Sequence, residues 1–326
     1  MKCGKLSNDV LNDIIIKGIK KKNKDIIVGP KVGEDCSIIK FGEDICVLTT
    51  DPITAAKNNA GRIGVHICCN DIASSGVRPI GILITILAPT ECSIDDIKKV
   101  MDEINNACEE LNIDVLGGHT EITDAVNKIV LSLTAIGKGI NGKYITTSGA
   151  QLGDDIVVAG YAASEGTAII ASDYYEQLRG KINDDILIKA QSFINDISVV
   201  KIGFVASEFG VNAMHDATEG GVLGAIWEVT EASDKGAYIY KDKIPVREET
   251  KIICKELNID PLRLISSGCM IISCCNGDGL VKRLKECGIE AEVVGKIIKE
   301  GRILFSEGKE IELFPPDSDE IYKVSL

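Results

Sequence analysis

Four aspartates in the sequence share a local context that suits metal binding. Each lies where an apolar run meets a glycine or a polar residue: Asp35 after Gly33-Glu34, Asp51 after Thr49-Thr50, Asp71 after Asn70, and Asp216 after His215. Magnesium takes hard oxygen ligands and is usually held by one or two carboxylates together with substrate phosphates. Helix capping or turn chemistry would explain any one of these aspartates. The set predicts a magnesium site only if folding gathers its members.

Two Gly-Gly pairs follow apolar runs and could bring backbone close to a ligand. Gly117-Gly118 follows residues 113–116, and Thr120 offers a hydroxyl two residues later. Gly220-Gly221 precedes a helical pattern, whose first N–H groups could bind phosphate. Both pairs are equally typical of simple turns. The Gly-x-x-x-x-Gly-Lys-Ser/Thr pattern is absent from the sequence, so this is not a P-loop protein.

The chain has three histidines. His66 falls in an apolar helical pattern, where a structural role is expected. His119 and His215 flank the glycine-rich segments, and we therefore take both as candidate catalytic residues. Two widely separated histidines without cysteine partners do not make a zinc site. No Gly-x-Ser-x-Gly elbow supports a Ser-His-Asp triad.

Alternating helices and strands must position these residues. Apolar periodicity predicts helices over 7–19, 61–75 and 93–111, the last with a capping box formed by Ser93 and Asp96, and a further helix through Val222, Ile226 and Val229. Short apolar or alternating runs predict strands over 45–50, 80–87, 113–116, 129–135, 155–159 and 211–214. A polar, glycine-rich stretch over 142–153 marks a boundary. We therefore expect two α/β domains, residues 1–148 and 149–326, with an irregular tail from Pro315.

Composition limits the partners that the chain can have. The net charge of −13 and the lack of a basic stripe disfavour nucleic-acid binding. No apolar stretch approaches the roughly 18 residues that span a bilayer, and the first residues lack the apolar core of a signal peptide. We therefore expect a cytoplasmic protein without a membrane partner. Its 12 cysteines are then best interpreted as reduced, because most lie in apolar segments.

The order of these motifs resembles the aminoimidazole ribonucleotide synthetase (PurM-like) superfamily, which includes HypE, thiamine-monophosphate kinase and selenophosphate synthetase. The resemblance spans nearly the whole chain and is closest to the HypE type. It rests on Gly33-Glu34-Asp35, Thr49-Thr50-Asp51, Asn70-Asp71-Ile72-Ala73, Gly76-Val77-Arg78-Pro79, Gly117-Gly118-His119-Thr120, Asp216-Ala217-Thr218-Glu219-Gly220-Gly221 and Ile244-Pro245-Val246-Arg247-Glu248-Glu249.

The resemblance implies an N-terminal α/β domain whose sheet pairs with a second copy to close a barrel, and a C-terminal α/β domain beside it. ATP would lie in the cleft, partly at the interface of the homodimer. The residues that the resemblance assigns to magnesium are Asp35, Asp51, Asp71 and Asp216; those lining the nucleotide are Asn70, Gly117, Gly118, Thr120 and Thr218; and Lys5 lies in a segment that covers the phosphates.

Two departures from the family pattern bear on activity. His119 stands where related chains have an aspartate, and we hypothesise that Glu121 supplies the missing carboxylate. HypE chains end in a cysteine that accepts a carbamoyl group, whereas the last cysteine here is Cys287. The leading prediction is a HypE-like enzyme that uses ATP to phosphorylate an oxygen of an unidentified acceptor, in the setting of hydrogenase maturation. The alternatives are a small-molecule kinase or synthetase of the same superfamily, and a nucleotide-binding regulator without turnover.

Overall fold

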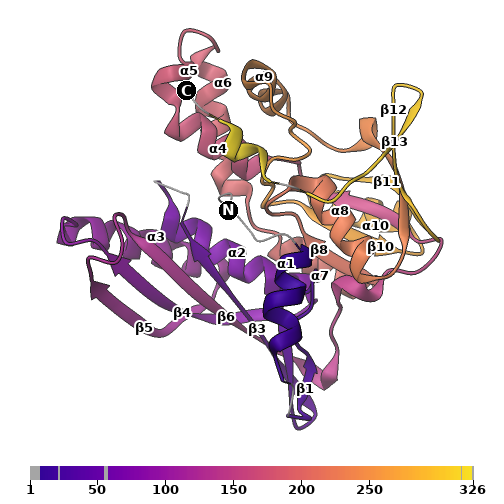
Figure 1. Cartoon of the computed structure of the whole chain (residues 1–326), viewed down its shortest axis with the longest axis horizontal. Helices are drawn as coiled ribbons and strands as arrows, with labels where there is room; N and C mark the ends of the chain where they lie inside the picture. Colours follow the sequence, from indigo (N-terminus) through magenta and orange to yellow (C-terminus); the bar gives the residue numbers. More distant parts are fainter. Residues whose placement is uncertain (1–7, 21–22, 55–57, 317, 325–326) are drawn as a thin grey trace.

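The computed structural model describes residues 8–20, 23–54, 58–316 and 318–324. Two β-sheets with flanking helices make up this part of the chain, one from residues 26 to 139 and the other from 155 to 312 (Figure 1). The predicted α/β fold class is confirmed. The predicted boundary between residues 148 and 149 falls in the connection between the two sheets, and the domain limits themselves stay a prediction.

The first sheet has six strands in the order β1-β2-β3-β6-β4-β5. Neighbouring strands are antiparallel except β4 and β5, which are parallel. The predicted strands over 45–50 and 80–87 lie within longer ones, and the one predicted over 129–135 begins one residue later and continues to Gly139. The six strands are β1 (Ile26–Val28), β2 (Ser37–Phe41), β3 (Asp44–Ile53), β4 (Arg78–Ala88), β5 (Asp114–Ile122) and β6 (Val130–Gly139).

Helices α2 (Ala60–Ser74) and α3 (Ile94–Leu111) cover one face of this sheet. The capping box predicted for α3 is confirmed, because Ser93 and Asp96 bond to each other's backbone N–H. Alternate residues of β4 have opposite environments, as expected for a strand with one covered face. Ile82 and Ile84 are buried on the helix side, whereas Leu83 is 40% exposed on the other side.

β5 differs from its prediction. The expected strand ended at Leu116 and turned at Gly117-Gly118, but the strand continues to Ile122. A Cβ on Gly118 would lie 1.9 Å from the carbonyl oxygen of Ile84. The glycine therefore allows β5 to approach β4 closely, and the turn interpretation was wrong.

The second sheet has seven strands in the order β13-β12-β9-β11-β7-β10-β8. Helix α8 (Gly221–Ala232) packs on one face, and α7 (Val200–Phe209) and α10 (Gly277–Glu286) pack on the other. The strand predicted over 155–159 is confirmed, while the one predicted over 211–214 begins two residues later. The strands are β7 (Asp155–Ala159), β8 (Ala213–Asp216), β9 (Gly236–Tyr240), β10 (Met270–Cys274), β11 (Ala291–Ile298), β12 (Arg302–Ser306) and β13 (Lys309–Glu312).

Shorter helices complete the described residues. The helix predicted over 7–19 is present over residues 8–18, where the backbone stays helical while its hydrogen bonding changes from α to π to 3-10, and its expected cap, Ser7, lies outside the described residues. The tail is more regular than expected, because it contains η7. The remaining helices are α1 (Asn8–Val10), η1 (Leu11–Ile15), η2 (Ile16–Gly18), η3 (Ile140–Gly142), η4 (Thr147–Gly149), α4 (Ser164–Asp173), α5 (Tyr175–Leu178), α6 (Asp184–Gln191), η5 (Ser192–Asp196), η6 (Lys241–Lys243), α9 (Glu248–Leu257) and η7 (Glu320–Lys323).

The two halves of the chain meet along α2, which packs against α7 and contacts β8. The approach is close: a Cβ on Gly203 in α7 would lie 2.5 Å from the carbonyl oxygen of Ala73 in α2. Asp71 lies on the α2 side of this junction and Asp216 at the end of β8. The contact between the halves therefore brings together carboxylates that are far apart in sequence.

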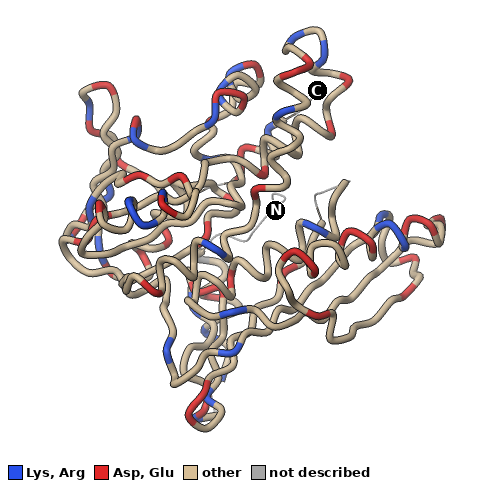
Figure 2. Tube along the Cα trace, turned by 180° about the vertical axis from the view of Figure 1, so that it is seen from behind, with Lys and Arg blue, Asp and Glu red and all other residues tan. Residues whose placement is uncertain are grey.

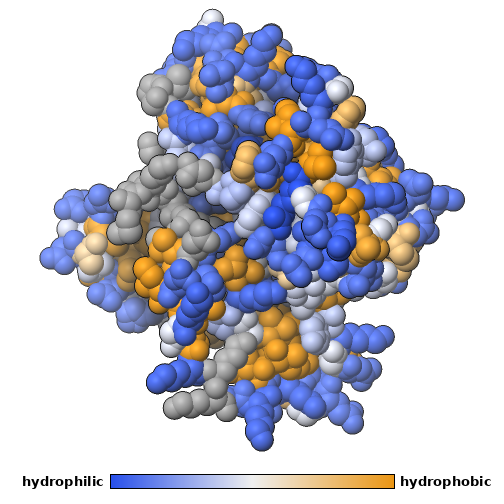
Figure 3. Space-filling model, turned by 45° about the vertical axis from the view of Figure 1, so that its right-hand side comes forward, coloured by the Kyte–Doolittle hydropathy of each residue, from blue (hydrophilic) through white to orange (hydrophobic). Residues whose placement is uncertain are grey.

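Acidic and basic residues are interspersed along the trace, without a long basic stretch (Figure 2). Apolar side chains interrupt a mostly hydrophilic surface, with a large group in the lower part of the view in Figure 3, at the height of β1 in Figure 1. None of the helices in the described residues has the length and apolar character that crossing a membrane would require.

Candidate metal and nucleotide site

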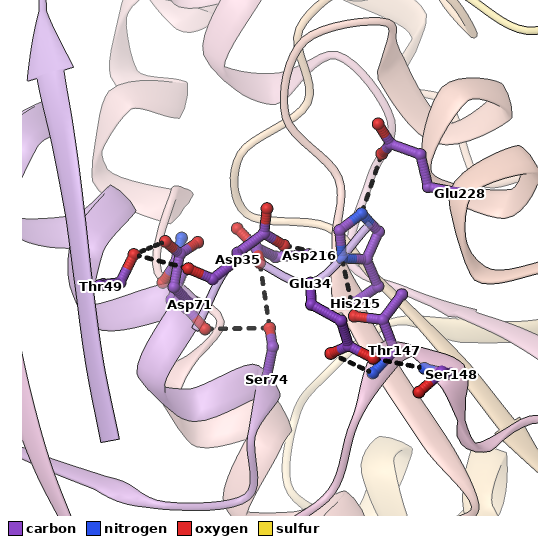
Figure 4. Close-up of polar contacts among 11 residues, drawn as sticks. Glu34, Asp35, Thr49, Asp71, Ser74, Thr147, Ser148, His215, Asp216 and Glu228 are labelled. Carbon is purple, nitrogen blue, oxygen red and sulfur yellow. Dashed lines mark hydrogen bonds and ion pairs between the residues drawn. The ribbon is translucent and has the colours of Figure 1, made fainter. Parts of the chain in front are cut away.

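Four acidic side chains from separate segments gather at the junction between the two halves, and Figure 4 shows three of them, Asp35, Asp71 and Asp216. Asp35 precedes β2, Asp71 is in α2, Asp216 ends β8, and Asp51 lies in β3. Burial is the main cause that raises the pKa of Asp71 well above its usual range, and the negative charges of Asp216, Asp35 and Asp51 raise it further. These three carboxylates therefore lie close to Asp71. The structure thus brings together the four aspartates that the sequence singled out. Their role as metal ligands stays a prediction.

Asp71 is held by a threonine that the sequence analysis did not assign to the site. The hydroxyl of Thr49 donates to Oδ2 of Asp71 at 2.6 Å and also lies 3.2 Å from the carbonyl oxygen of Asp35. Thr49 and Asp51 are two residues apart on β3, so both side chains face α2. Accordingly, Oδ2 of Asp51 lies 3.9 Å from the sulfur of Cys68 in α2.

Asp216 is the most deeply buried carboxylate of the cluster. It lies in the second half of the chain and contacts the first half. Its residue is 1% exposed, and Oδ1 accepts a hydrogen bond from Ser74 at 3.1 Å. Oδ2 is buried and has no hydrogen-bond partner among the described residues. Burial and the neighbouring Asp35 raise the pKa of Asp216 to about 6. A buried carboxylate oxygen without a partner is costly, and a cation at this point would remove that cost.

His215 lies between two carboxylates. Its Nδ1 is 3.0 Å from Oδ2 of Asp35, and its Nε2 is 2.9 Å from Oε2 of Glu228 in α8. Burial alone would lower the pKa of His215, but the two carboxylates outweigh burial and hold it well above its usual range. The sequence predicted a catalytic role for His215, and the structure places it among the candidate metal ligands.

The loop that carries Asp35 is fixed to the segment between the two sheets. The carboxylate of Glu34 accepts hydrogen bonds from the backbone N–H of Thr147 at 3.3 Å and of Ser148 at 3.2 Å. A small pocket borders this loop and is lined by Asp35, Cys36, Asp71, Ser74 and Thr147 among others. Glu34 therefore orients the loop, whereas Asp35 faces the site.

The residues predicted on β5 do not reach this cluster within one chain. The strand register aligns Asp51 with Leu133, Ile84 and Gly118, so Gly118 lies three strands from Asp51, on the order of 14 Å away. Thr120 lies on the same face of β5 as Gly118, whereas His119 and Glu121 lie on the opposite face. There, Nε2 of His119 is 3.6 Å from Oε2 of Glu121. The idea that Glu121 completes the site from the same chain is not supported by this placement.

Asn70 and the Gly220-Gly221 pair are engaged by protein groups. The amide of Asn70 donates to the carbonyl of Ile197 and accepts from the N–H of Val199, both at 2.8 Å. The N–H of Gly220 donates to Asp319 at 2.7 Å, and that of Gly221 to the carbonyl of Thr218 at 3.1 Å. The N–H groups of Gly220 and Gly221 are therefore engaged within the chain, and the phosphate-binding role of this helix start stays a prediction.

Several site residues escaped the sequence analysis. Ser74 lies one helical turn after Asn70, and its position on the same helix as Asp71 was a usable signal. The sequence gives no comparable signal for Thr147 and Glu228, because their contacts with His215 depend on how η4 and α8 pack. Lys5, which was predicted to cover the phosphates, lies outside the described residues.

Two sheets with flanking helices that meet at a carboxylate cluster define a mixed α/β protein with a candidate cation site between its two halves. The family model for the N-terminal domain of AIR synthase related proteins matches residues 33–138, and the model for their C-terminal domain matches residues 153–306. The chain therefore belongs to the AIR synthase related proteins. The superfamily resemblance drawn from the motifs is confirmed.

Among similar proteins, a provisionally named hydrogenase expression/formation protein of Methanocaldococcus jannaschii is 29% identical over 91% of this chain and 89% of its own length. Carbamoyl dehydratase HypE of Cupriavidus necator is 25% identical, over 78% of this chain and 74% of its own. A solved HypE–HypF complex contains a chain that superimposes with a TM-score of 0.78 at 20% identity, covering 96% of this chain and 100% of that one. The PurM-like fold is thereby confirmed.

Proposed function

We propose that this chain is a magnesium-dependent, ATP-binding enzyme of the HypE-like type that phosphorylates an oxygen of an acceptor. The observation that carries the proposal is the convergence of Asp35, Asp51, Asp71 and Asp216 at the junction of the two halves. The relative from Methanocaldococcus jannaschii is named as a hydrogenase expression/formation protein, and a solved HypE is described as a hydrogenase maturation protein; we propose the same setting here.

The residues present fit a divalent cation. Oδ2 of Asp216 is buried without a partner, and Asp71 is surrounded by like charges that raise its pKa. Both features are unfavourable in the protein alone and would be relieved by bound positive charge. Magnesium held there would bridge and neutralise the phosphates of the nucleotide. Thr49 and Ser74 orient the carboxylates of Asp71 and Asp216.

Solved neighbours support the nucleotide. One is a HypE in complex with ATP, with a TM-score of 0.68, and another is a ThiL complexed with AMPPCP and TMP, with a TM-score of 0.69. Phosphoryl transfer depends mainly on positioning and charge neutralisation, so the buried carboxylates can serve it without a dedicated base. Thr218 and Lys5 remain candidates for nucleotide contact.

A homodimer would complete the first sheet. On the face opposite α2, Ile80 and Leu83 are 46% and 40% exposed, and β5 leaves a strand edge without a neighbour among the described residues. Exposed apolar side chains beside an open strand edge are typical of an interaction surface. We propose that a second copy covers this face, where it would meet His119 and Glu121. Their predicted roles in catalysis and metal binding would then belong to the assembled dimer.

Two measurements test the proposed function. Isothermal titration with a non-hydrolysable ATP analogue should show binding that requires Mg2+ and is lost in Asp71→Asn. A coupled assay should then show ADP release with a carbamoylated protein acceptor. ADP release only with thiamine monophosphate would favour a small-molecule kinase, and Mg2+-dependent nucleotide binding without turnover would favour a regulator. Nucleotide binding that is indifferent to Mg2+ and to Asp71 would refute the site.

A further inference from the structure

Three side chains in the cluster present ligand atoms of two kinds. One oxygen of Asp35, one nitrogen of His215 and one oxygen of Asp216 all lie within 4.8 Å of one another. Figure 4 shows these side chains directed toward one another, two from the end of β8 and one from the loop before β2. Oδ2 of Asp216 has no hydrogen-bond partner among the described residues although it is buried. A buried carboxylate oxygen without a partner, grouped with an imidazole nitrogen, is a set of ligand atoms that a bound cation would satisfy.

His215 is held as metal-binding histidines usually are. Such a histidine donates its second ring N–H to a carboxylate, which fixes the ring and directs the other nitrogen to the metal. Here Glu228 is 2.9 Å from Nε2, so Nδ1 is the nitrogen that faces Asp35, at 3.0 Å. Glu228 comes from α8, which packs directly on β8. The ring orientation is thus set by the fold of the second half of the chain.

We propose that Asp35, His215 and Asp216 form a mixed nitrogen–oxygen site that prefers a divalent transition-metal ion to Mg2+. Imidazole nitrogen suits transition metals, whereas Mg2+ is usually bound by oxygen alone. Asp51 and Asp71 would supply the all-oxygen part of the cluster. The inference rests on the metal site in the proposed function, and it assigns His215 as a ligand.

The alternative is that His215 acts only as a cation that neutralises Asp35. The two roles predict opposite effects of removing the ring. If His215 is a ligand, its loss weakens the binding of transition metals and has little effect on Mg2+. If it is only a cation, its loss removes repulsion and strengthens the binding of every divalent ion.

The experiment uses the full chain without nucleotide. Co2+ and Mg2+ affinities are measured by isothermal titration for the native protein, His215→Ala and Glu228→Ala, and Mn2+ is added for electron spin echo measurements of nitrogen coupling. We expect Co2+ to bind the native protein more tightly than Mg2+. Glu228→Ala should lose about tenfold to a hundredfold in Co2+ affinity, the cost typical of a lost outer-shell partner, and His215→Ala, which removes the ligand itself, should lose at least as much. Glu228→Gln should recover part of the loss, because its amide oxygen can still accept from Nε2.

The spectroscopic measurement does not depend on a variant that folds. Native protein with Mn2+ should show coupling to one imidazole nitrogen, and the matched variant His66→Gln, whose ring in α2 lies beside Glu110 and outside the cluster, should retain it. Absence of nitrogen coupling, its loss in His66→Gln, or tighter binding of both ions by His215→Ala would overturn the inference and leave the proposed magnesium site standing. Failure of every divalent ion to bind, both in this titration and in the presence of the ATP analogue, would instead refute the metal site of the proposed function.

Discussion

Single carboxylates at the junction carry most of the functional argument. The sequence could nominate Asp35, Asp51, Asp71 and Asp216, because each follows an apolar run, and Asp71 is conspicuous inside an apolar helix. It could not nominate Glu228, whose carboxylate reaches His215 only because α8 packs on β8. Residue type and local context reveal chemistry that is unusual for its position. Partners supplied by tertiary packing leave no such trace.

The Asp71 carboxylate provides the sharpest test at this scale. In Asp71→Asn the amide oxygen can still accept from Thr49, but the buried charge is gone. We therefore expect the variant to be more stable than the native protein without metal, since the like charges around it raise the pKa of Asp71. The native protein should gain about 2.7 kcal/mol from Mg2+ at a hundred times its dissociation constant, and Asp71→Asn should gain much less.

Urea unfolding with and without MgCl2 measures both effects. Asp44→Asn is a suitable control, because Asp44 lies on the same sheet and pairs with Lys138 outside the cluster. It should keep the full gain from Mg2+. An undiminished gain in Asp71→Asn would show that the ion binds elsewhere.

A second buried acid gives a pH-dependent prediction away from the cluster. Glu165 in α4 is 2% exposed, Oε2 has no hydrogen-bond partner among the described residues, and burial raises its pKa to about 7. Asp319 and Glu219 add to this increase. A raised carboxyl pKa favours the protonated folded state, so the associated stability is present below pH 4.5 and is lost as pH rises through about 7.

Glu165→Gln should remove this dependence. At pH 8 we expect the variant to exceed the native protein in unfolding free energy by up to about 3 kcal/mol, and the difference should shrink toward zero near pH 4. Urea unfolding across this range measures it, with the exposed Glu43→Gln as control. A difference that is constant with pH would show that Glu165 does not titrate on unfolding.

Helices and strands could be predicted where a periodic apolar pattern determines the type of element. They were harder to predict where a glycine could indicate either a turn or a close backbone contact. The capping box at the start of α3 and the alternating burial of β6 agree with the sequence patterns. β5 does not, since Gly117-Gly118 resembles a turn but continues a strand. A glycine signals either a turn or a close approach between backbones, and only the position of the neighbouring strand distinguishes them.

Gly118→Ala tests the close approach. The new Cβ would meet the carbonyl oxygen of Ile84 at 1.9 Å, so β5 must move away from β4. We expect a loss of roughly 1–3 kcal/mol in unfolding free energy, as for other overpacked sites, and faster amide exchange along β5. Gly18→Ala has no atom within 4 Å of its Cβ and should be nearly neutral. Equal stability of both variants would mean that β5 adjusts freely.

At the scale of the whole molecule, the junction between the halves creates the cluster, and this junction could not be read from the sequence. Two α/β domains were expected, but the pairing of α2 with α7 and β8 depends on complementary packing, such as Gly203 against Ala73. The same scale includes the proposed second copy. Its contact face was predicted only through the family resemblance, because strand alternation marks an exposed face without saying what covers it.

Leu83 is the residue through which the dimer can be tested. It is 40% exposed on the face of the first sheet opposite α2, in register with Thr134 and Thr50 of the neighbouring strands. A lysine there would place a charge in the centre of the proposed interface, where burying an unpaired charge is costly. We expect the native protein to sediment as a dimer and Leu83→Lys as a folded monomer with weakened nucleotide binding.

Ile188→Lys is the matched control, because Ile188 is 56% exposed on α6, in the other half of the chain. It should remain dimeric, since no part of the first sheet is changed. A native protein that sediments as a monomer at micromolar concentration, yet binds nucleotide with Mg2+, would show that one chain holds a complete site and would remove His119 and Glu121 from it.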